Sequence, residues 1–277
     1  MTRLIVVAIA VALCAGTAGA AGPRIGQLTA SRDGWHATLT FTKTRDPYPE
    51  DSHFHLTVKD GTRVVLDQAV TSSLPDVGSQ FQPGGFGQPV LSFRDLNGDG
   101  SRELVLLLFT GGAHCCSFDQ IFDFSGAKPR KTEFDFADSG AAIKVVGGKV
   151  LFASGDDSFA YAFTDYADSG EPIELRTYDA GRFTNVTRDY PSVVAKDAAF
   201  WWTQYRHSLK TGRDERGILA AWSADEALLG HAAGAKQTLV RLSATGVLNR
   251  ASGLPLPKGS AYIKALWRFL DKEGYLR

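Results

Sequence analysis

The sequence lacks a hydrophobic run long enough to cross a membrane. Its clearest apolar stretch, from Leu4 to Ala15, has 12 residues, whereas a membrane-spanning helix needs about 20. No later segment is apolar enough to cross a membrane. We therefore predict that the mature chain has no transmembrane segment.

The short motifs of several large enzyme classes are also missing. The chain has no G-x-S-x-G elbow, no H-E-x-x-H pair and no G-x-x-x-x-G-K loop, which removes the sequence support for those hydrolases, metalloproteases and nucleotide-binding enzymes. Acidic residues are plentiful, but no spacing singles out a catalytic pair, such as Asp156 with Asp165.

An excess of charge of one sign is absent as well, because 30 Lys and Arg balance 30 Asp and Glu. This balance hides a division along the chain. Residues 21–189 carry 16 basic and 23 acidic side chains, and residues 190–277 carry 13 basic and 7 acidic ones. The basic stripe Lys264, Arg268 and Lys272 is interpreted as a solvated helix face, and no nucleic-acid partner is predicted.

The N-terminus has the pattern of an export signal. Arg3 precedes the apolar stretch, and Ala18-Gly19-Ala20 then forms an A-x-A cleavage site. We predict that residues 1–20 are a cleaved signal peptide and that the protein is secreted or periplasmic. Calcium is abundant outside the cytoplasm, so even a weak calcium site would be filled there.

Hydrophobic periodicity changes near Tyr190. Before it, residues 21–189 show short alternating or apolar runs separated by turn dipeptides. After it, Pro191 suits a first helical position, Ser223-x-x-Glu226 has the form of a capping box, and a helical period is present around Trp267. The expected fold is mainly β, as a propeller-like or multi-stranded antiparallel sheet repeat, followed by a helical domain over residues 190–277.

Residues 95–103 contain the chemistry that is most specific. The segment D-L-N-G-D-G-S-R-E places oxygen ligands at alternate positions of a tight loop, with a glycine at position 6. Ca²⁺ takes six to eight oxygens at about 2.3–2.6 Å, and such a loop supplies them. The predicted ligands are the side chains of four residues and the carbonyl of a fifth: Asp95, Asn97, Asp99 and Glu103, with Ser101.

The sequence around this loop separates it from an EF-hand. Position 12 is Leu106 instead of a bidentate Glu, and the flanks resemble strands. The region 84–113 resembles the FG-GAP and VCBS-type repeats of integrin-like β-propellers, whose calcium positions match those of the loop. The resemblance implies a calcium loop between strands. The loop occurs once, whereas a propeller would show several copies.

The adjacent cysteines Cys115 and Cys116 are the second unusual feature, and follow Gly111-Gly112-Ala113-His114. They are interpreted as a vicinal disulfide, which an oxidising compartment favours. Two free thiols and a redox or soft-metal site with His114 remain alternatives. The string resembles uncharacterised secreted bacterial proteins that carry a GGAHCC-like segment after a calcium loop.

Two further patterns are present. D-F-A-D-S-G at residues 135–140 recurs as D-Y-A-D-S-G at residues 165–170; the pair is either two similar acidic turns that open similar strands or a set of degenerate blade loops. The aromatic cluster Phe200-Trp201-Trp202 could stack on a sugar or peptide, although packing of the helices onto the sheet explains it more simply.

These observations predict an exported, calcium-stabilised, non-enzymatic binding module whose partner is a protein or glycan. The alternatives are an exported redox or metal-dependent enzyme centred on His114, Cys115 and Cys116, and a structural envelope protein.

Overall fold

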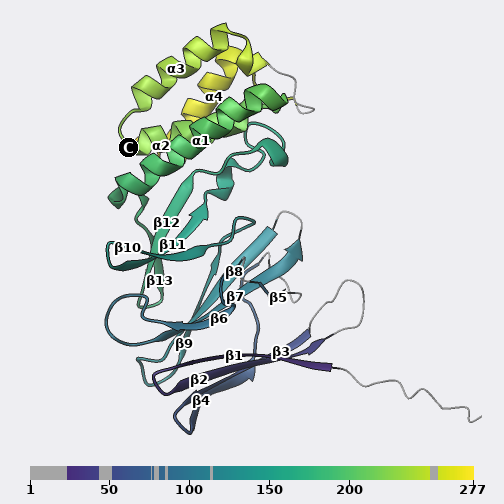
Figure 1. Ribbon diagram of the computed structural model, residues 1–277, viewed down its shortest axis with the longest axis vertical. Helices are drawn as coiled ribbons and strands as arrows, with labels where there is room; N and C mark the ends of the chain where they lie inside the picture. Colours follow the sequence, from purple (N-terminus) through teal and green to yellow (C-terminus); the bar gives the residue numbers. More distant parts are fainter. Residues whose placement is uncertain are drawn as a thin grey trace, which may run out of the picture.

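The computed structural model describes residues 24–43, 52–75, 77, 81–84, 87–112, 115–249 and 255–277. The signal peptide predicted for residues 1–20 lies outside them. Strands occupy the described chain up to Asn185, and the α-helices follow from Pro191. The expected fold class, mainly β with a C-terminal helical segment, is confirmed. Three antiparallel sheets and the helices succeed one another along the long axis of the molecule (Figure 1).

The first sheet is a four-stranded antiparallel meander in which each strand pairs with its sequence neighbour. Its second strand shows why it forms, because Ala37, Leu39 and Phe41 are buried while the intervening residues are more exposed. This alternation gives the sheet one apolar face. The strands are β1 (Arg24–Arg32), β2 (Trp35–Lys43), β3 (Ser52–Asp60) and β4 (Arg63–Ala69).

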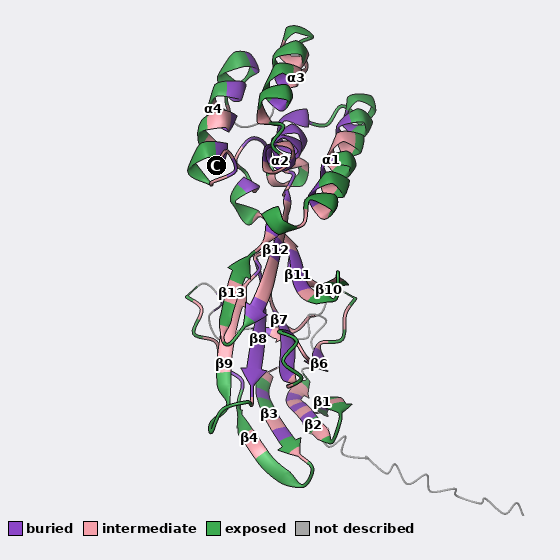
Figure 2. Ribbon diagram, turned by 90° about the vertical axis from the view of Figure 1, so that its left-hand side faces the viewer, coloured by how far each residue is buried: buried purple, intermediate pink, exposed green. Residues whose placement is uncertain are grey.

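The second sheet has five strands, and β7 lies at its centre. Residues Leu104, Leu106 and Leu108 pack toward the first sheet, whereas Val105 and Leu107 pack toward the third. Burial on both faces explains the uninterrupted apolar run of this strand, which Figure 2 shows in purple. The strands are β5 (Gln82–Pro83), β6 (Leu91–Arg94), β7 (Glu103–Gly112), β8 (Cys115–Asp123) and β9 (Arg130–Asp135).

The third sheet, again a meander, separates the second sheet from the helices. Phe152 and Tyr178 face the second sheet, and Leu151 and Leu175 face α1 through Val193. The strands are β10 (Ala142–Val146), β11 (Lys149–Gly155), β12 (Ile173–Asp179) and β13 (Arg182–Asn185), with the short helices η1 (Asp157–Phe159) and η2 (Tyr166–Asp168) between β11 and β12 and η3 (Thr187–Asp189) after β13.

Four α-helices with their own apolar core form the C-terminal part. The first begins at Pro191, as predicted. The predicted capping box at Ser223 is wrong: this residue lies inside the second helix and its Oγ donates to the carbonyl of Leu219 at 2.7 Å. Asp214 caps that helix instead. The helices are α1 (Pro191–Thr211), α2 (Glu215–Leu228), α3 (Ala232–Ala244) and α4 (Gly259–Lys272), with η4 (Val247–Asn249) before α4.

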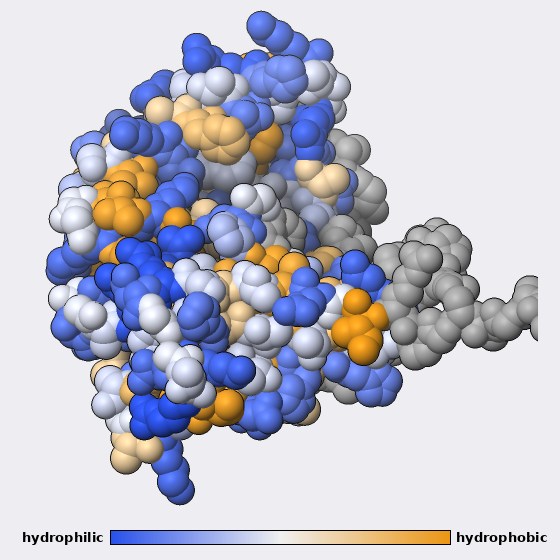
Figure 3. Space-filling model, turned by 60° about the horizontal axis from the view of Figure 1, so that its bottom comes forward, coloured by the Kyte–Doolittle hydropathy of each residue, from blue (hydrophilic) through white to orange (hydrophobic). Residues whose placement is uncertain are grey.

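The end of the molecule that the first sheet forms presents a mixed surface. Polar and apolar side chains alternate over it without one dominant patch (Figure 3). Single exposed apolar side chains there, such as Ile25 and Val64, are ordinary for a folded protein and need no partner.

Candidate functional site

Residues 95–103 form the turn between β6 and β7, which pair antiparallel with Arg94 opposite Glu103. The loop therefore joins two strands, as the sequence predicted. Gly98 and Gly100 have φ values of 81° and 88°, a conformation that residues with a side chain rarely adopt. The two glycines let the chain curl tightly enough for alternate side chains to face inward.

The carboxylates of the loop turn inward and accept hydrogen bonds from its own backbone. Asp95 accepts from the N–H groups of Gly98 at 2.7 Å and Gly100 at 3.1 Å. Asp99 accepts from the N–H of Ser101 at 2.7 Å. The loop is thus ordered around a set of oxygens by local hydrogen bonds, which are typical of Asp and Asn in turns.

Glu103, at the start of β7, is the buried member of this set, with 2% of its surface exposed. Burial raises the pKa of its carboxyl, and the negative charges of Asp99 and Asp123 raise it further, against the lowering effect of backbone N–H donors such as that of Leu96 at 2.9 Å. The pKa of Asp99 is lowered by hydrogen bonds, chiefly from Ser101. A nearby dication would favour the charged form of both groups.

The loop also contacts the other two sheets. Asn97 Nδ2 donates to Asp179 Oδ1, in the last residue of β12, at 3.3 Å. Arg102 Nε donates to Asp33 Oδ2 at 3.2 Å, in the turn between β1 and β2, and Arg102 lies 3.8 Å from Asp95. One short segment therefore connects all three sheets.

The five predicted calcium ligands lie together in this turn, but calcium binding stays a prediction. Within the described part of the chain, no three His, Cys, Asp or Glu side chains are grouped so that they could hold a metal by themselves. A calcium site here would need the amide oxygen of Asn97 and the carbonyl of Ser101 as well, and such neutral oxygens are usual ligands of Ca²⁺.

The cysteine segment lies at the opposite end of β7, where Gly112 is paired with Cys115. Cys116 is 1% exposed, and its backbone N–H donates to Thr110 Oγ1 at 2.9 Å. Residues 113–114 and the side chain of Cys115 lie outside the described residues. The vicinal pairing, and a site that includes His114, stay predictions.

The two copies of the repeated hexapeptide lead into β10 and β12, the two neighbours of β11. In each copy the first aspartate caps a turn: Asp135 accepts from the N–H of Ala137 at 2.8 Å, and Asp165 from that of Asp168 at 3.0 Å. The interpretation as similar acidic turns that open similar strands fits this arrangement. Both copies line a cavity of about 580 Å³ at that end of the third sheet.

Helix α1 covers this cavity with Asp197 and Trp201. Asp225 on the neighbouring helix α2 is fully buried, and neither of its carboxyl oxygens has a hydrogen-bond partner within the described residues. Burial and the neighbouring Asp197 raise the pKa of Asp225 to about 10, and burial raises that of Asp197. The carboxyl of Asp225 is therefore protonated at neutral pH. Glu171 is a further lining residue whose pKa is raised, mainly by burial.

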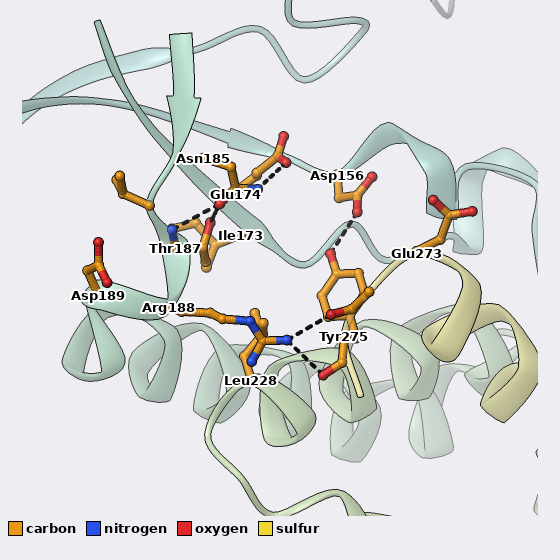
Figure 4. Close-up of a pocket in the computed structure, with 12 residues that line it drawn as sticks. Asp156, Ile173, Glu174, Asn185, Thr187, Arg188, Asp189, Leu228, Glu273 and Tyr275 are labelled. Carbon is orange, nitrogen blue, oxygen red and sulfur yellow. Dashed lines mark hydrogen bonds between the residues drawn. The ribbon is translucent and has the colours of Figure 1, made fainter. Parts of the chain in front are cut away.

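A second cavity, of about 390 Å³, lies where the third sheet meets the C-terminus (Figure 4). The Tyr275 hydroxyl donates to Asp156 Oδ2 at 2.7 Å. Arg188 Nη2 donates to the carbonyls of Gly274 at 2.8 Å and Tyr275 at 3.1 Å. Because these groups hydrogen-bond one another, the contacts attach the last turn of the chain to the third sheet.

Sequence reasoning did not identify the pair Asp197 and Asp225, because the two residues are 28 positions apart on different helices and share no motif. Trp201 was noted only as part of an aromatic cluster. The cluster divides in the structure: Trp202 packs against Trp222 of helix α2, with ring centroids 4.8 Å apart, instead of against the sheet as expected, whereas Trp201 lines the larger cavity.

No family model matches this sequence, and no solved structure matches it. The chain is similar to a probable thylakoid lumen protein of Synechocystis sp., with 26% identity over 220 residues. The matched region covers 68% of this chain and 60% of that relative, so the similarity spans less than two thirds of the relative's length. No helix in the described residues combines the length and apolar character needed to cross a bilayer.

Proposed function

We propose that this chain is an exported β-rich protein that acts outside the cytoplasm as a non-enzymatic binding module and is stabilised by Ca²⁺. Two observations support the location. The N-terminus has the charge, apolar stretch and A-x-A site of a signal peptide, and the Synechocystis relative is a probable lumen protein. The similarity to FG-GAP and VCBS-type loops favours a binding role.

The arrangement of residues 95–103 carries the calcium proposal. Asp95, Asp99 and Glu103 each accept hydrogen bonds from backbone N–H groups of this loop, and the loop reaches the first and third sheets through Arg102 and Asn97. A dication bound there would offset the repulsion among the carboxylates and rigidify the segment that joins the sheets. Binding to the folded state alone stabilises it by mass action.

The test is a thermal melt of the mature protein with Ca²⁺ and with a chelator, for wild type and for Asp99→Ala. At a calcium concentration about 100-fold above Kd, the gain is about 2.7 kcal/mol, which shifts the midpoint of a chain this long by about 5–10 °C. We expect this shift in wild type and its loss in Asp99→Ala.

Asp67→Ala is the matched control, because Asp67 is an exposed carboxylate on β4 that bonds His55 and Thr57, outside the loop. This variant should keep the full calcium shift. If the midpoint of the wild type is the same with Ca²⁺ and with chelator, the loop is an acidic turn and the calcium proposal is wrong.

A further inference from the structure

Two aromatic pairs border the cavity between the third sheet and α1. The rings of Trp201 and Phe200 have centroids 4.9 Å apart, and those of Tyr166 and Tyr161 are 5.4 Å apart. Trp201 and Tyr166 line the cavity, and their outer partners Phe200 and Tyr161 are 48% and 50% exposed. Exposed aromatic rings that continue into a cavity are typical of ligand contact.

The backbone of Tyr161 adds an independent observation. Its φ is 60°, a left-handed conformation that is a genuine outlier for a bulky side chain. The Tyr161 N–H donates to Ser169 Oγ at 3.1 Å, and that hydroxyl donates to the carbonyl of Asp165 at 2.9 Å. The second copy of the hexapeptide therefore holds the strained residue, and strain of this kind concentrates at binding sites.

Hydrogen bonds fix the orientation of the Trp201 indole. Its Nε1 donates to Asp197 Oδ2 at 2.9 Å, and the same oxygen accepts from the N–H of Ile173 at 2.9 Å. Asp197 thus connects the Trp201 indole on α1 to the first residue of β12. The ring is thus fixed before any ligand arrives, which lowers the entropic cost of binding.

The polar residues that line the cavity include hydrogen-bond donors and acceptors, with one acidic and one basic group among them. Ser154 contributes a hydroxyl, Glu171 a carboxyl and Lys144 an ammonium group. An anion would lie against Glu171 and Asp197, and a cation would lie against Lys144. A neutral ligand with many hydroxyl groups can donate to the carboxyls and accept from the ammonium group, and its C–H faces can pack on the aromatic rings.

We propose that this cavity binds a neutral sugar ring, either as a free saccharide or as a residue of a glycan. Its volume of about 580 Å³ lies within the range of about 300–1,000 Å³ that is usual for small-ligand sites. The aromatic rings form the stacking platform, and Glu171 and Lys144 bond the hydroxyl groups. This inference rests on the proposed role as a binding module and assigns that role a ligand class and a location.

The experiment is saturation-transfer NMR on the mature protein with glucose, galactose, mannose and N-acetylglucosamine and with their β-1,4-linked disaccharides and tetrasaccharides. We expect transfer to the ring C–H protons of at least one sugar. Similar Kd values for the monosaccharide and the tetrasaccharide indicate a free saccharide as the ligand, and Kd values at least ten-fold lower for the tetrasaccharide indicate a glycan.

Variants then locate the site. Tyr166→Ala and Lys144→Ala should each weaken binding at least ten-fold, and their melting curves show whether they fold. Trp267→Ala, at a partly exposed ring on α4 that contacts Lys236, should bind as wild type does. The proposal is overturned if no sugar of the set binds, or if the two cavity variants bind as tightly as Trp267→Ala.

Each titration is run with Ca²⁺ and with chelator, so that the two proposals fail separately. If the protein binds a sugar but is not stabilised by calcium, the sugar-site proposal is supported and the calcium proposal is wrong. If calcium raises the melting midpoint but no sugar binds, the sugar-site proposal is wrong and the calcium proposal is supported.

Discussion

At the scale of single residues, the paired carboxyls of Asp197 and Asp225 are the most unusual chemistry of the described chain. Asp225 is fully buried, and a lone carboxylate there would be costly because it is removed from water. Protonation of Asp225 avoids that cost, and Asp197 accepts hydrogen bonds from Trp201 and Ile173. The pair therefore links the folding of α1 and α2 to the start of β12.

This pair predicts how stability depends on pH. The pKa of Asp225 is about 10 in the folded protein and about 3.9 when unfolded, so the folded state binds more protons between these values. Stability must then fall as pH rises through this window. Asp225→Asn keeps a hydrogen-bonding group without titrating, and should raise the free energy of unfolding at pH 8 by on the order of 2–4 kcal/mol.

Urea denaturation at pH 5 and pH 8 checks this. The gain from Asp225→Asn should be smaller at pH 5, where less free energy is needed to protonate the wild-type pair. Asp271→Asn, at an exposed carboxylate of α4, is the control and should change little at either pH. An equal effect of Asp225→Asn at both pH values contradicts the assignment.

At the scale of elements, α2 depends on one residue at its start. It is the central helix of the C-terminal part, and nearly all of its residues are buried. Arg216 has no exposed surface, and its guanidinium bonds Asp214 Oδ2 at 2.5 Å and the carbonyl of Pro257 at 2.8 Å. Asp214 Oδ1 also accepts from the Arg216 N–H at 3.0 Å as the helix cap. One carboxylate thus provides both the cap and the counter-charge.

Asp214→Ala should therefore destabilise the protein by about 3–5 kcal/mol, because it leaves a buried guanidinium without its counter-charge and removes a cap that is worth about 1 kcal/mol. Asp214→Asn keeps an oxygen for the cap and should have an intermediate effect, as measured by urea denaturation. Asp165→Ala, which removes the cap of the short exposed η2, should cost about 1 kcal/mol or less. Similar losses in all three variants would mean that the buried ion pair has no special role.

At the scale of the whole molecule, a few polar contacts connect layers that otherwise pack through apolar cores. Loop 95–103 reaches the first and third sheets, and the C-terminal turn is fastened to the third sheet by Tyr275 and Arg188. Burial and the neighbouring Asp156 raise the pKa of the Tyr275 hydroxyl above its ordinary value, so it remains a hydrogen-bond donor at any physiological pH.

Tyr275→Phe removes this donor without changing the shape of the ring. The hydroxyl bonds a carboxylate, so its loss should cost about 1.5–3 kcal/mol and should speed amide hydrogen exchange in the C-terminal turn. Glu273→Gln, which removes the charge from an ion pair with the exposed Lys272, should cost less than about 1 kcal/mol. Unchanged exchange in Tyr275→Phe would show that the apolar contacts of the ring hold the turn without the hydrogen bond.

The sequence alone determined which segments form strands and helices where a local pattern was strong. The side chains of Trp35–Lys43 alternate in the pattern that predicts a strand, and this segment is β2. The helix at Pro191 and the turn at residues 95–103 followed from proline geometry and from glycine at the left-handed positions. Strands such as β1 and β9 were missed, because polar residues interrupt their pattern and pairing with a neighbouring strand stabilises them.

Tertiary structure decided everything that depends on residues distant in the sequence. Ser223 has the form of a helix cap, but burial of α2 on all sides placed it inside the helix. Asp197 meets Asp225 only because α1 packs on α2, and the two hexapeptides share a cavity only because β10 and β12 both pair with β11. Local patterns determine local conformation, whereas the site they form depends on which surfaces pack together.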